Sequence, residues 1–364
     1  MTCYQVYLET VDDGRCIAHV LDLPGCIVRE PTRDRALRRA PEAIREYGAW
    51  LRRHGEPAPP EGEPIEVALA GESAGFGPFD PGDAAALFPP DREPVTSEDM
   101  ERCLRLAAHA RADLLDLVRD LPDEVLDWRP DPQSFSIRRL LRHVGNSGEG
   151  YVSRIVPPEN LPPEWEHDDE LSIFEFLEME LRTALACLRR LTEEERSGVF
   201  RSAHWTNHPE EPWTARKVLR RFIEHELEHT AQAREILAAR RAHLLADLAA
   251  ARAELLWQIV SLDEGALTAS SVFDDWTAKD LLAHIAAWDR WEHRTMKCML
   301  AGSVPVFSAV EDQDAFNAAV VAQWRDRALA EVLAELQAAR ADWVAWLRSL
   351  PEEAFFRPRF FHTW

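Results

Sequence analysis

Two histidines four residues apart in one predicted helix constrain this chain more than any other feature. His225 and His229 lie within residues 214–237, which contain no proline or glycine and repeat apolar residues with a helical period. A spacing of four stacks two side chains on one helix face. That face also carries Val218, Phe222, Gln232 and Ile236. Because the face is mostly apolar, both imidazoles are expected to point into a core.

A third histidine, His143, lies on a separate predicted helix that begins near Ser136. Burying an imidazole costs free energy unless it finds a partner, and a shared divalent metal would supply one. A single core histidine is more often only hydrogen-bonded, so the prediction depends on three positions agreeing with a bundle geometry. We therefore predict that His143, His225 and His229 bind a divalent metal that keeps open positions for chemistry. Imidazoles suit zinc, nickel, iron, manganese or copper, so the sequence does not name the metal.

Two neighbours of these histidines are predicted to assist them. Gln232 continues the histidine stripe and is expected to hydrogen-bond a ligand imidazole from behind. Glu226 lies about 100° around the helix from His225, where it is either a catalytic base beside the metal or, more often at such positions, a surface acid. Residues 225–229 also satisfy the HExxH pattern of zinc proteases, which needs a third ligand downstream. The nearest spaced candidate, Glu254, falls in the next predicted helix, so a protease is the weakest interpretation.

The net charge argues against one large class of partner. The chain has 42 basic and 64 acidic side chains and a formal charge of −22, which repels phosphate backbones and disfavours nucleic acid. Its six cysteines are scattered without a CxxC pair, which is typical of free thiols in a reducing cytoplasm. The first residues lack the pattern of a signal peptide, and no apolar run is long enough to span a membrane. We expect a cytoplasmic protein that acts on a small molecule.

Periodicity divides the first 240 residues into three segments. Residues 1–70 alternate like strands around a predicted helix at 32–53 and form a small α+β unit. Residues 71–95 are rich in glycine and proline and are interpreted as a linker. Residues 96–240 contain four amphipathic helices, typical of a bundle that builds a metal site between facing helices. The predicted fold class is therefore α+β, a small α+β domain followed by mainly α four-helix bundles.

Residues 241–364 repeat the bundle incompletely. Leu262 precedes His284 by 22 residues, as Leu121 precedes His143. A third helix at 327–350 follows, but the position equivalent to the histidine helix falls beyond the last residue. We therefore predict a second bundle that lacks its fourth helix, either because the chain is a fragment or because another subunit completes it.

Residues 18–47, AHVLDLPGCIVREPTRDRALRRAPEAIREY, resemble the HicB-like antitoxin domain. The shared features are the D-L-P-G-C turn, a following strand, and a helix that opens with threonine and ends in Ala-Ile. Proteins with this domain usually carry a separate DNA-binding module, and the sequence contains no recognisable one. The resemblance implies that residues 1–70 are a HicB-like domain reused for another purpose.

The helix that bears His143, followed far downstream by HELEH and then a glutamine, resembles the DinB/YfiT-like superfamily. The second copy, with WTAKDLLAHIAAW at 276–288, resembles another branch of that superfamily. The resemblance covers most of residues 96–364 and implies a four-helix bundle whose divalent metal is bound by three histidines, here His143, His225 and His229. It also implies homodimers, with activities such as transfer of low-molecular-weight thiols to electrophiles or hydrolytic resistance reactions. In the second copy only His284 matches a ligand.

Two functional hypotheses follow from these features. The first is a DinB-like metal-dependent enzyme, a thiol transferase or hydrolase of small electrophiles, in bacterial stress or detoxification. The alternative is a non-catalytic binding protein that uses the HicB-like unit. The incomplete ligand set of the second copy favours the alternative, because a bundle evidently persists there with one matching histidine.

Overall fold

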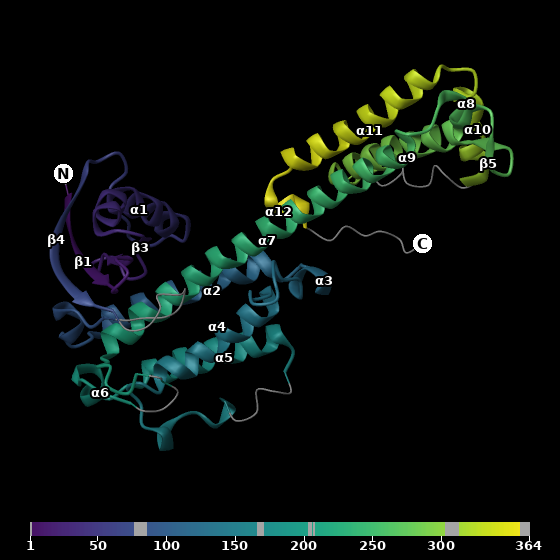
Figure 1. Cartoon of the computed structure of the whole chain (residues 1–364). Coiled ribbons are helices and arrows are strands. Elements are labelled where there is room, and N and C mark those ends of the chain that lie inside the picture. Colours follow the sequence, from purple (N-terminus) through teal and green to yellow (C-terminus); the bar gives the residue numbers. More distant parts are fainter. Residues whose placement is uncertain are drawn as a thin grey trace. The chain divides into compact units, whose positions relative to one another are not determined.

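The computed structural model describes residues 2–75, 86–165, 171–202, 206, 208–302 and 313–356 (Figure 1). The chain divides into two compact units, Met1–Ile236 and Leu237–Trp364. A small mixed sheet with one helix opens the first unit, and helical bundles make up the rest, so the predicted fold class is confirmed. None of the helices in the described ranges combines the length and apolarity that a bilayer-spanning segment needs.

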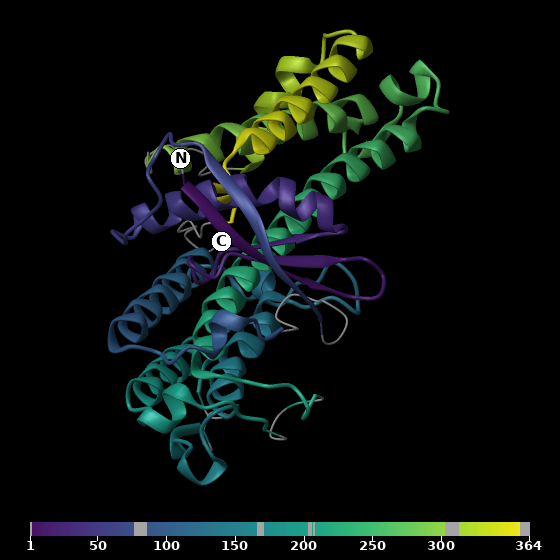
Figure 2. The ribbon, with the colours of Figure 1, turned by 90° about the vertical axis from the view of Figure 1, so that its left-hand side faces the viewer.

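Four strands and one helix form the N-terminal part of the first unit, as the strand-like alternation predicts. The strands are β1 (Thr2–Thr10), β2 (Cys16–His19), β3 (Ile27–Glu30) and β4 (Ile65–Ala74), in the order β3-β2-β1-β4. Neighbouring strands are antiparallel except β1 and β4, which are parallel. Helix α1 (Arg33–Arg53) lies against the sheet, with Ala40, Ile44 and Leu51 fully buried (Figure 2).

The turn between β2 and β3 packs against the histidine helix. Gly25 in this turn has a φ of +99°, a left-handed conformation that glycine adopts without strain. A Cβ there would also lie 2.5 Å from the side chain of Ile223. The D-L-P-G motif therefore has a packing reason for its glycine, in addition to its role in the turn.

The interpretation of residues 71–95 as a linker is only partly right. Residues 71–74 extend β4 beyond the predicted strand and pair with β1. After residues 76–85, which lie outside the described ranges, Phe88, Asp91 and Val95 are buried around a short 3-10 helix, η1 (Pro89–Arg92). Glycine and proline content predicts irregular backbone, but it says nothing about whether such a segment packs against a neighbouring domain.

Four long helices form the first bundle: α2 (Ser97–Val118), α4 (Ile137–Val152), α5 (Ile173–Arg189) and the first half of α7 (Ala215–Ile259). Thr96 and Ser136 cap α2 and α4, each accepting a hydrogen bond from a backbone N–H of the first turn. Short helices α3 (Asp123–Leu126), η2 (Pro158–Asn160) and α6 (Glu193–Ser197) lie between the long ones. Gly145 allows α4 and α5 to approach closely, because a Cβ at this position would overlap the Phe176 ring.

Helix α7 is one continuous helix of 45 residues, whereas the sequence predicted two helices with a domain boundary at residue 240. Residues 215–259 contain no proline or glycine, so no backbone signal ends the helix where one bundle gives way to the next. The division between the two compact units falls inside this helix, after Ile236.

The second unit contains the rest of α7 and two further long helices, α9 (Ala278–Leu300) and α11 (Leu329–Ser349). Shorter elements are α8 (Glu264–Thr268), β5 (Ser271–Phe273), β6 (Trp276–Thr277), α10 (Gln313–Trp324) and α12 (Glu352–Phe355). Leu282, Val332 and Leu336 lie at the centre of its core. Asp289 of α9 accepts hydrogen bonds from Arg252 of α7 and Arg340 of α11, which ties the three long helices together.

Candidate metal centre

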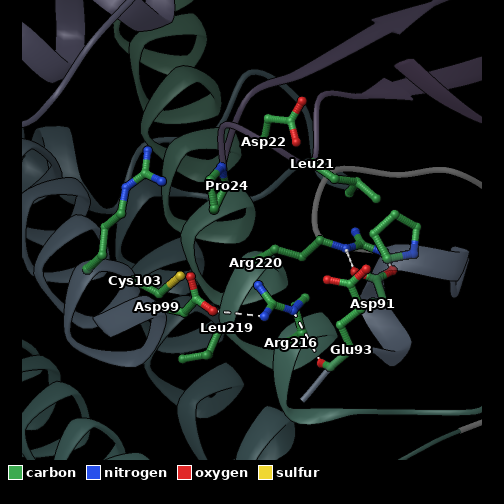
Figure 3. A pocket seen from close by; sticks show the side chains of 12 residues that line it. Leu21, Asp22, Pro24, Asp91, Glu93, Asp99, Cys103, Arg216, Leu219 and Arg220 are labelled. Atoms are coloured by element: carbon green, nitrogen blue, oxygen red, sulfur yellow. Dashed lines mark hydrogen bonds and ion pairs between the residues drawn. The ribbon is translucent and has the colours of Figure 1, made fainter. Parts of the chain in front are cut away.

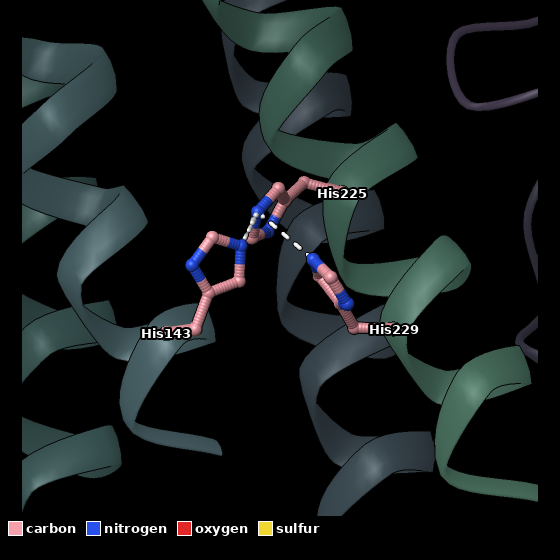
Figure 4. Close-up of side chains that lie close together, drawn as sticks. All are labelled: His143, His225 and His229. Carbon is pink, nitrogen blue, oxygen red and sulfur yellow. Dashed lines mark hydrogen bonds between the residues drawn. The ribbon is translucent and has the colours of Figure 1, made fainter. Parts of the chain in front are cut away.

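The three predicted ligand histidines lie together in the first unit. His143 comes from α4, and His225 and His229 come from successive turns of α7 (Figure 4). Their candidate ligand atoms all lie within 4.8 Å of one another. The Nε2 atom of His225 is 3.1 Å from the Nε2 atoms of both other rings. His225 and His229 are buried while His143 is exposed, so the cluster has one side open to solvent.

These distances fit a divalent ion. Two nitrogens bonded to one metal at about 2.1 Å lie about 3.0 Å apart in octahedral geometry and about 3.4 Å apart in tetrahedral geometry. The two Nε2 separations of 3.1 Å fall between these values. Three ring nitrogens gathered within 4.8 Å of one another cannot all be satisfied by hydrogen bonds to each other when the rings are neutral. The donor set therefore suits a metal held by nitrogen ligands, and a divalent ion is the cofactor that the geometry indicates.

Burial keeps the two α7 imidazoles neutral. Burial is the largest cause that lowers the pKa of His225 well below its usual value, and His229, His143 and Arg221 add to it. Burial and His143 lower the pKa of His229 to about 3, against the hydrogen bond of Gln232. A neutral imidazole offers a lone pair to a metal, so protons compete little for these two ligands near neutral pH.

Gln232 lies where the sequence analysis expected it. Its Oε1 atom is 2.7 Å from Nδ1 of His229. When Nδ1–H donates to this oxygen, the lone pair of His229 is on Nε2 and points at the cluster. The corresponding Nδ1 of His225 is buried and has no hydrogen-bond partner among the described residues. The two α7 histidines therefore differ in how their rings are oriented, one by an amide and the other by packing.

The more common interpretation of Glu226, a surface acid, is wrong. Its side chain is fully buried, and both carboxylate oxygens face the guanidinium of Arg111 on α2. Arg111 Nε and Nη2 donate to them at 3.0 and 2.5 Å. A carboxylate held by a bidentate guanidinium is fixed in orientation and directed toward that cation. The geometry gives Glu226 the position of a structural anion between α2 and α7.

Two other acids of the histidine helix face the N-terminal sheet. His19 of β2 lies between Glu9 and Glu224, with its nitrogens 3.3 and 3.1 Å from their carboxylates. Glu228, between the two histidines of α7, accepts hydrogen bonds of 2.8 and 2.5 Å from Arg29 of β3. The contacts of Glu224 and Glu228 join the α+β part to the histidine helix α7.

The buried carboxylates raise the pKa of His19 and favour its protonated form. Burial alone would lower the pKa of His19, but the charge and hydrogen bond of Glu224, together with Glu9, outweigh it and raise the net value. Burial likewise raises the pKa of Glu9 on its own, yet the hydrogen bond and charge of His19 leave it lowered. The N-terminal sheet is therefore attached to α7 through a buried imidazole whose protonated form these carboxylates favour.

Tyr151 is a neighbour of the cluster that the sequence analysis did not single out as functional. It lies two turns after His143 on α4, and its ring meets the His225 ring edge-on with centroids 5.6 Å apart. Burial raises its pKa to about 12, so the phenol stays protonated. Its place on the His143 stripe was a usable signal, but an aromatic residue on such a stripe is usually part of the core.

A pocket of about 270 Å³ lies between the D-L-P-G turn and helices α2 and α7 (Figure 3). Arg220 and Arg216 in its wall are engaged by Asp91 and Asp99, respectively. None of the three histidines lines this pocket. Since its main charges already pair with each other, the histidine cluster remains the better candidate for chemistry.

In the second unit, His284 has no comparable partners. It is half-buried against Trp276, with ring centroids 5.4 Å apart, and burial lowers its pKa despite a hydrogen bond with Asn317. Across the part of the chain that the structure describes, only His143, His225 and His229 form a group of three or more side chains placed to hold a metal.

Comparisons with protein families match the two helical parts of the chain separately. Residues 106–233, which contain all three histidines, match the DinB superfamily. Residues 248–359 match the mycothiol maleylpyruvate isomerase N-terminal domain. The first bundle is therefore DinB-like, as its residues predicted. Both matches lie C-terminal to the small α+β unit, so the HicB-like resemblance stays a prediction.

One solved structure is similar over part of the chain. YfiT from Bacillus subtilis, described as a probable metal-dependent hydrolase with an unusual four-helix bundle topology, is 19% identical with a TM-score of 0.31. The similarity covers 42% of this chain and 91% of that one, and its score is too low to support an argument. No curated protein matches the chain significantly.

Proposed function

We propose that the chain is a metal-dependent enzyme whose divalent ion is held by His143, His225 and His229. The observation that carries the proposal is the convergence of three Nε2 atoms, with two separations of 3.1 Å, on the solvent-open side of a bundle. The match of residues 106–233 to the DinB superfamily supports it independently. A bound divalent ion would supply a Lewis acid that makes a nucleophile available at neutral pH.

The protein's own residues have separate tasks in this proposal. Gln232 fixes the ring of His229 so that its lone pair faces the ion. Tyr151 shields His225 and keeps one side of the centre dry, while exposed His143 leaves the opposite side open to substrate. Glu226 holds α7 against α2 through its pair with Arg111.

For the reaction, we propose thiol transfer to, or hydrolysis of, a small electrophile. The support is the match of residues 248–359 to the N-terminal domain of mycothiol maleylpyruvate isomerase, whose name includes a thiol, mycothiol. Zinc, nickel, iron and manganese all remain compatible with three imidazoles. A low-molecular-weight thiol as substrate and a homodimer as assembly belong to the same proposal.

For residues 1–70, we propose a HicB-like fold that braces the bundle. The D-L-P-G-C turn and the following strand and helix support the resemblance. The buried contacts of His19 and Arg29 with α7 favour a fixed structural part over a detached binding module. A binding protein without catalysis is therefore the second candidate. The presence or absence of a bound metal distinguishes it from the proposed enzyme.

Metal content per chain tests the proposed centre. Purified wild type should contain about one divalent ion per chain by inductively coupled plasma mass spectrometry. His143→Ala removes an exposed ligand and should abolish the metal while circular dichroism shows an intact fold; His243→Ala, at an exposed histidine of the second unit, should retain it. Wild type without stoichiometric metal, or full retention of the metal in His143→Ala, would refute the proposal.

A further inference from the structure

A second, cationic groove lies in the second unit between α9 and α11. It has a volume of about 580 Å³ and is lined by Arg290, His293, Arg294, Lys297, Asp342, Ala345 and Trp346. The chain as a whole carries a formal charge of −22, so a wall with three cationic side chains and one carboxylate is unusual for this surface. Such local excess charge attracts ligands of opposite sign.

Two of these cations make no close contact with an acidic side chain, although Lys297 is near enough to Asp342 to help lower the pKa of that carboxyl, after the larger effect of Arg290. Arg290 is paired, since it donates to Glu335 at 2.7 Å and to Asp342 at 2.5 Å. Arg294 and Lys297 are exposed, and neither makes a hydrogen bond or ion pair with any described residue. They lie one turn apart on α9, so both can reach one ligand.

His293 provides a buried polar group in the same groove. Its side chain is only 9% exposed, and its Nε2 atom is buried without a hydrogen-bond partner among the described residues. A buried imidazole nitrogen without a partner costs free energy, which a ligand atom in the groove would recover. His293 lies nine residues after His284, about two and a half turns, and therefore on the opposite face of α9 from that histidine.

Trp346 gives the groove a flat apolar wall. The centroids of the Trp346 and His293 rings lie 5.2 Å apart. The Nζ atom of Lys297 lies 5.9 Å from the centroid of the Trp346 ring. A ligand with a planar body can stack on an indole face while its charged group meets the cations.

We propose that this groove binds a small organic anion whose carboxylate or phosphate contacts His293, Arg294 and Lys297 and whose planar body lies on Trp346. The proposal does not depend on the metal centre, because every residue in it belongs to the second unit. Both headgroups share the same chemistry, an anionic oxygen that accepts charge-assisted hydrogen bonds.

Isothermal titration of the full chain with benzoate, phenyl phosphate, inorganic phosphate and benzylammonium tests the proposal at low ionic strength. Benzoate or phenyl phosphate should bind, more weakly as salt rises, and the tighter of the two identifies the headgroup. Inorganic phosphate should bind more weakly than phenyl phosphate, and benzylammonium should not bind. No binding of either aromatic anion, or equal binding of benzylammonium, would overturn the proposal.

Substitutions then locate the site. Arg294→Gln and Lys297→Gln alter exposed side chains, so the fold should persist, and each should weaken binding about 10-fold through loss of a charge-assisted hydrogen bond. Arg348→Gln removes the same charge from an exposed position of α11 that does not line the groove, and should leave the affinity unchanged. Unchanged affinity in both groove variants, or the same loss in all three, contradicts binding at this site.

Discussion

The buried pair of Glu226 and Arg111 decides whether the HExxH glutamate is structural or catalytic. Glu226→Gln keeps the shape of the side chain but removes its charge, leaving the guanidinium of Arg111 inside the protein without an anion. Arg111 is 2% exposed and Glu226 is fully buried, so solvent cannot replace the lost partner. Breaking a buried pair on one side costs about 3–5 kcal/mol.

The expected loss lies near the lower end of that range. The side-chain amide introduced by Glu226→Gln would still accept one hydrogen bond, and Arg111 Nη1 retains its bond of 2.7 Å to the carbonyl of Leu177. We therefore expect Glu226→Gln to reduce the free energy of unfolding by about 3 kcal/mol. The double variant Arg111→Met/Glu226→Leu removes both charges and should recover most of this loss, since apolar residues of similar volume often replace a buried pair without penalty.

Urea unfolding followed by far-ultraviolet circular dichroism measures these changes, and comparing the double variant with the single variants Arg111→Met and Glu226→Leu gives the coupling between the two residues. Metal content is determined on the same samples under conditions where each variant is folded. The structural role predicts lost stability with retained metal. A Glu226→Gln variant that unfolds within about 1 kcal/mol of wild type, but has lost its metal, would refute it and return Glu226 to the metal centre.

Three further predictions concern the surroundings of the centre. Gly145→Ala should be less stable than Gly150→Ala by about 1–3 kcal/mol, because only the first Cβ meets a buried ring while both gain the same helix propensity; equal stabilities would contradict the packing. The pKa of His19 is raised on folding, so its stabilising effect is complete below about pH 6.5 and is lost as pH rises through the folded value; the gap in unfolding free energy between wild type and His19→Gln should shrink as pH rises above about 6.5, and a gap that widens would reverse the sign. Gln232→Leu should weaken metal affinity by about 10–100-fold in chelator competition, whereas Gln232→Glu, which keeps an acceptor for His229, should not; equal losses would show that the acceptor is irrelevant.

Local signals predicted the elements of this fold well. Thr96 and Ser136 mark the starts of α2 and α4 because a side chain that accepts a backbone N–H acts within one turn of the chain. The spacing of His225 and His229 likewise fixes their common face without tertiary information. The approach of His143 to them is a tertiary fact, and it could be expected only from the general geometry of bundles and from the family resemblance.

Misassigned features depended on what lies outside the local sequence. The helix break expected near residue 240 has no proline, glycine or cap in its favour, and α7 passes through it, although the two compact units divide close by, after Ile236. Segment 71–95 has the composition of a linker, yet Phe88 and Asp91 are buried because neighbouring parts of the first unit cover them. Composition reports the flexibility of a backbone, whereas burial depends on what the rest of the chain brings to it.

The wrong expectation for Glu226 has a more general cause, which also explains why the metal centre is built on α7. An amphipathic helix exposes one face, and its acids are then expected in solvent. Residues 217–226 of α7 are instead buried all around the helix, and consecutive residues 224, 225 and 226 turn by about 100° each toward the sheet, α4 and α2.

Each of these directions has its own partner for a polar side chain. Glu224 meets His19, and Glu226 meets Arg111, so rotating α7 by one residue would break both buried pairs at once. A buried charge without its partner is far costlier than a displaced apolar contact, which makes such pairs effective in fixing register. The same rotation would carry His225 away from His143. Glu224 and Glu226 therefore hold the imidazoles in place through the orientation of the helix, and these acids are tolerated inside the protein because each meets a buried cationic or imidazole partner.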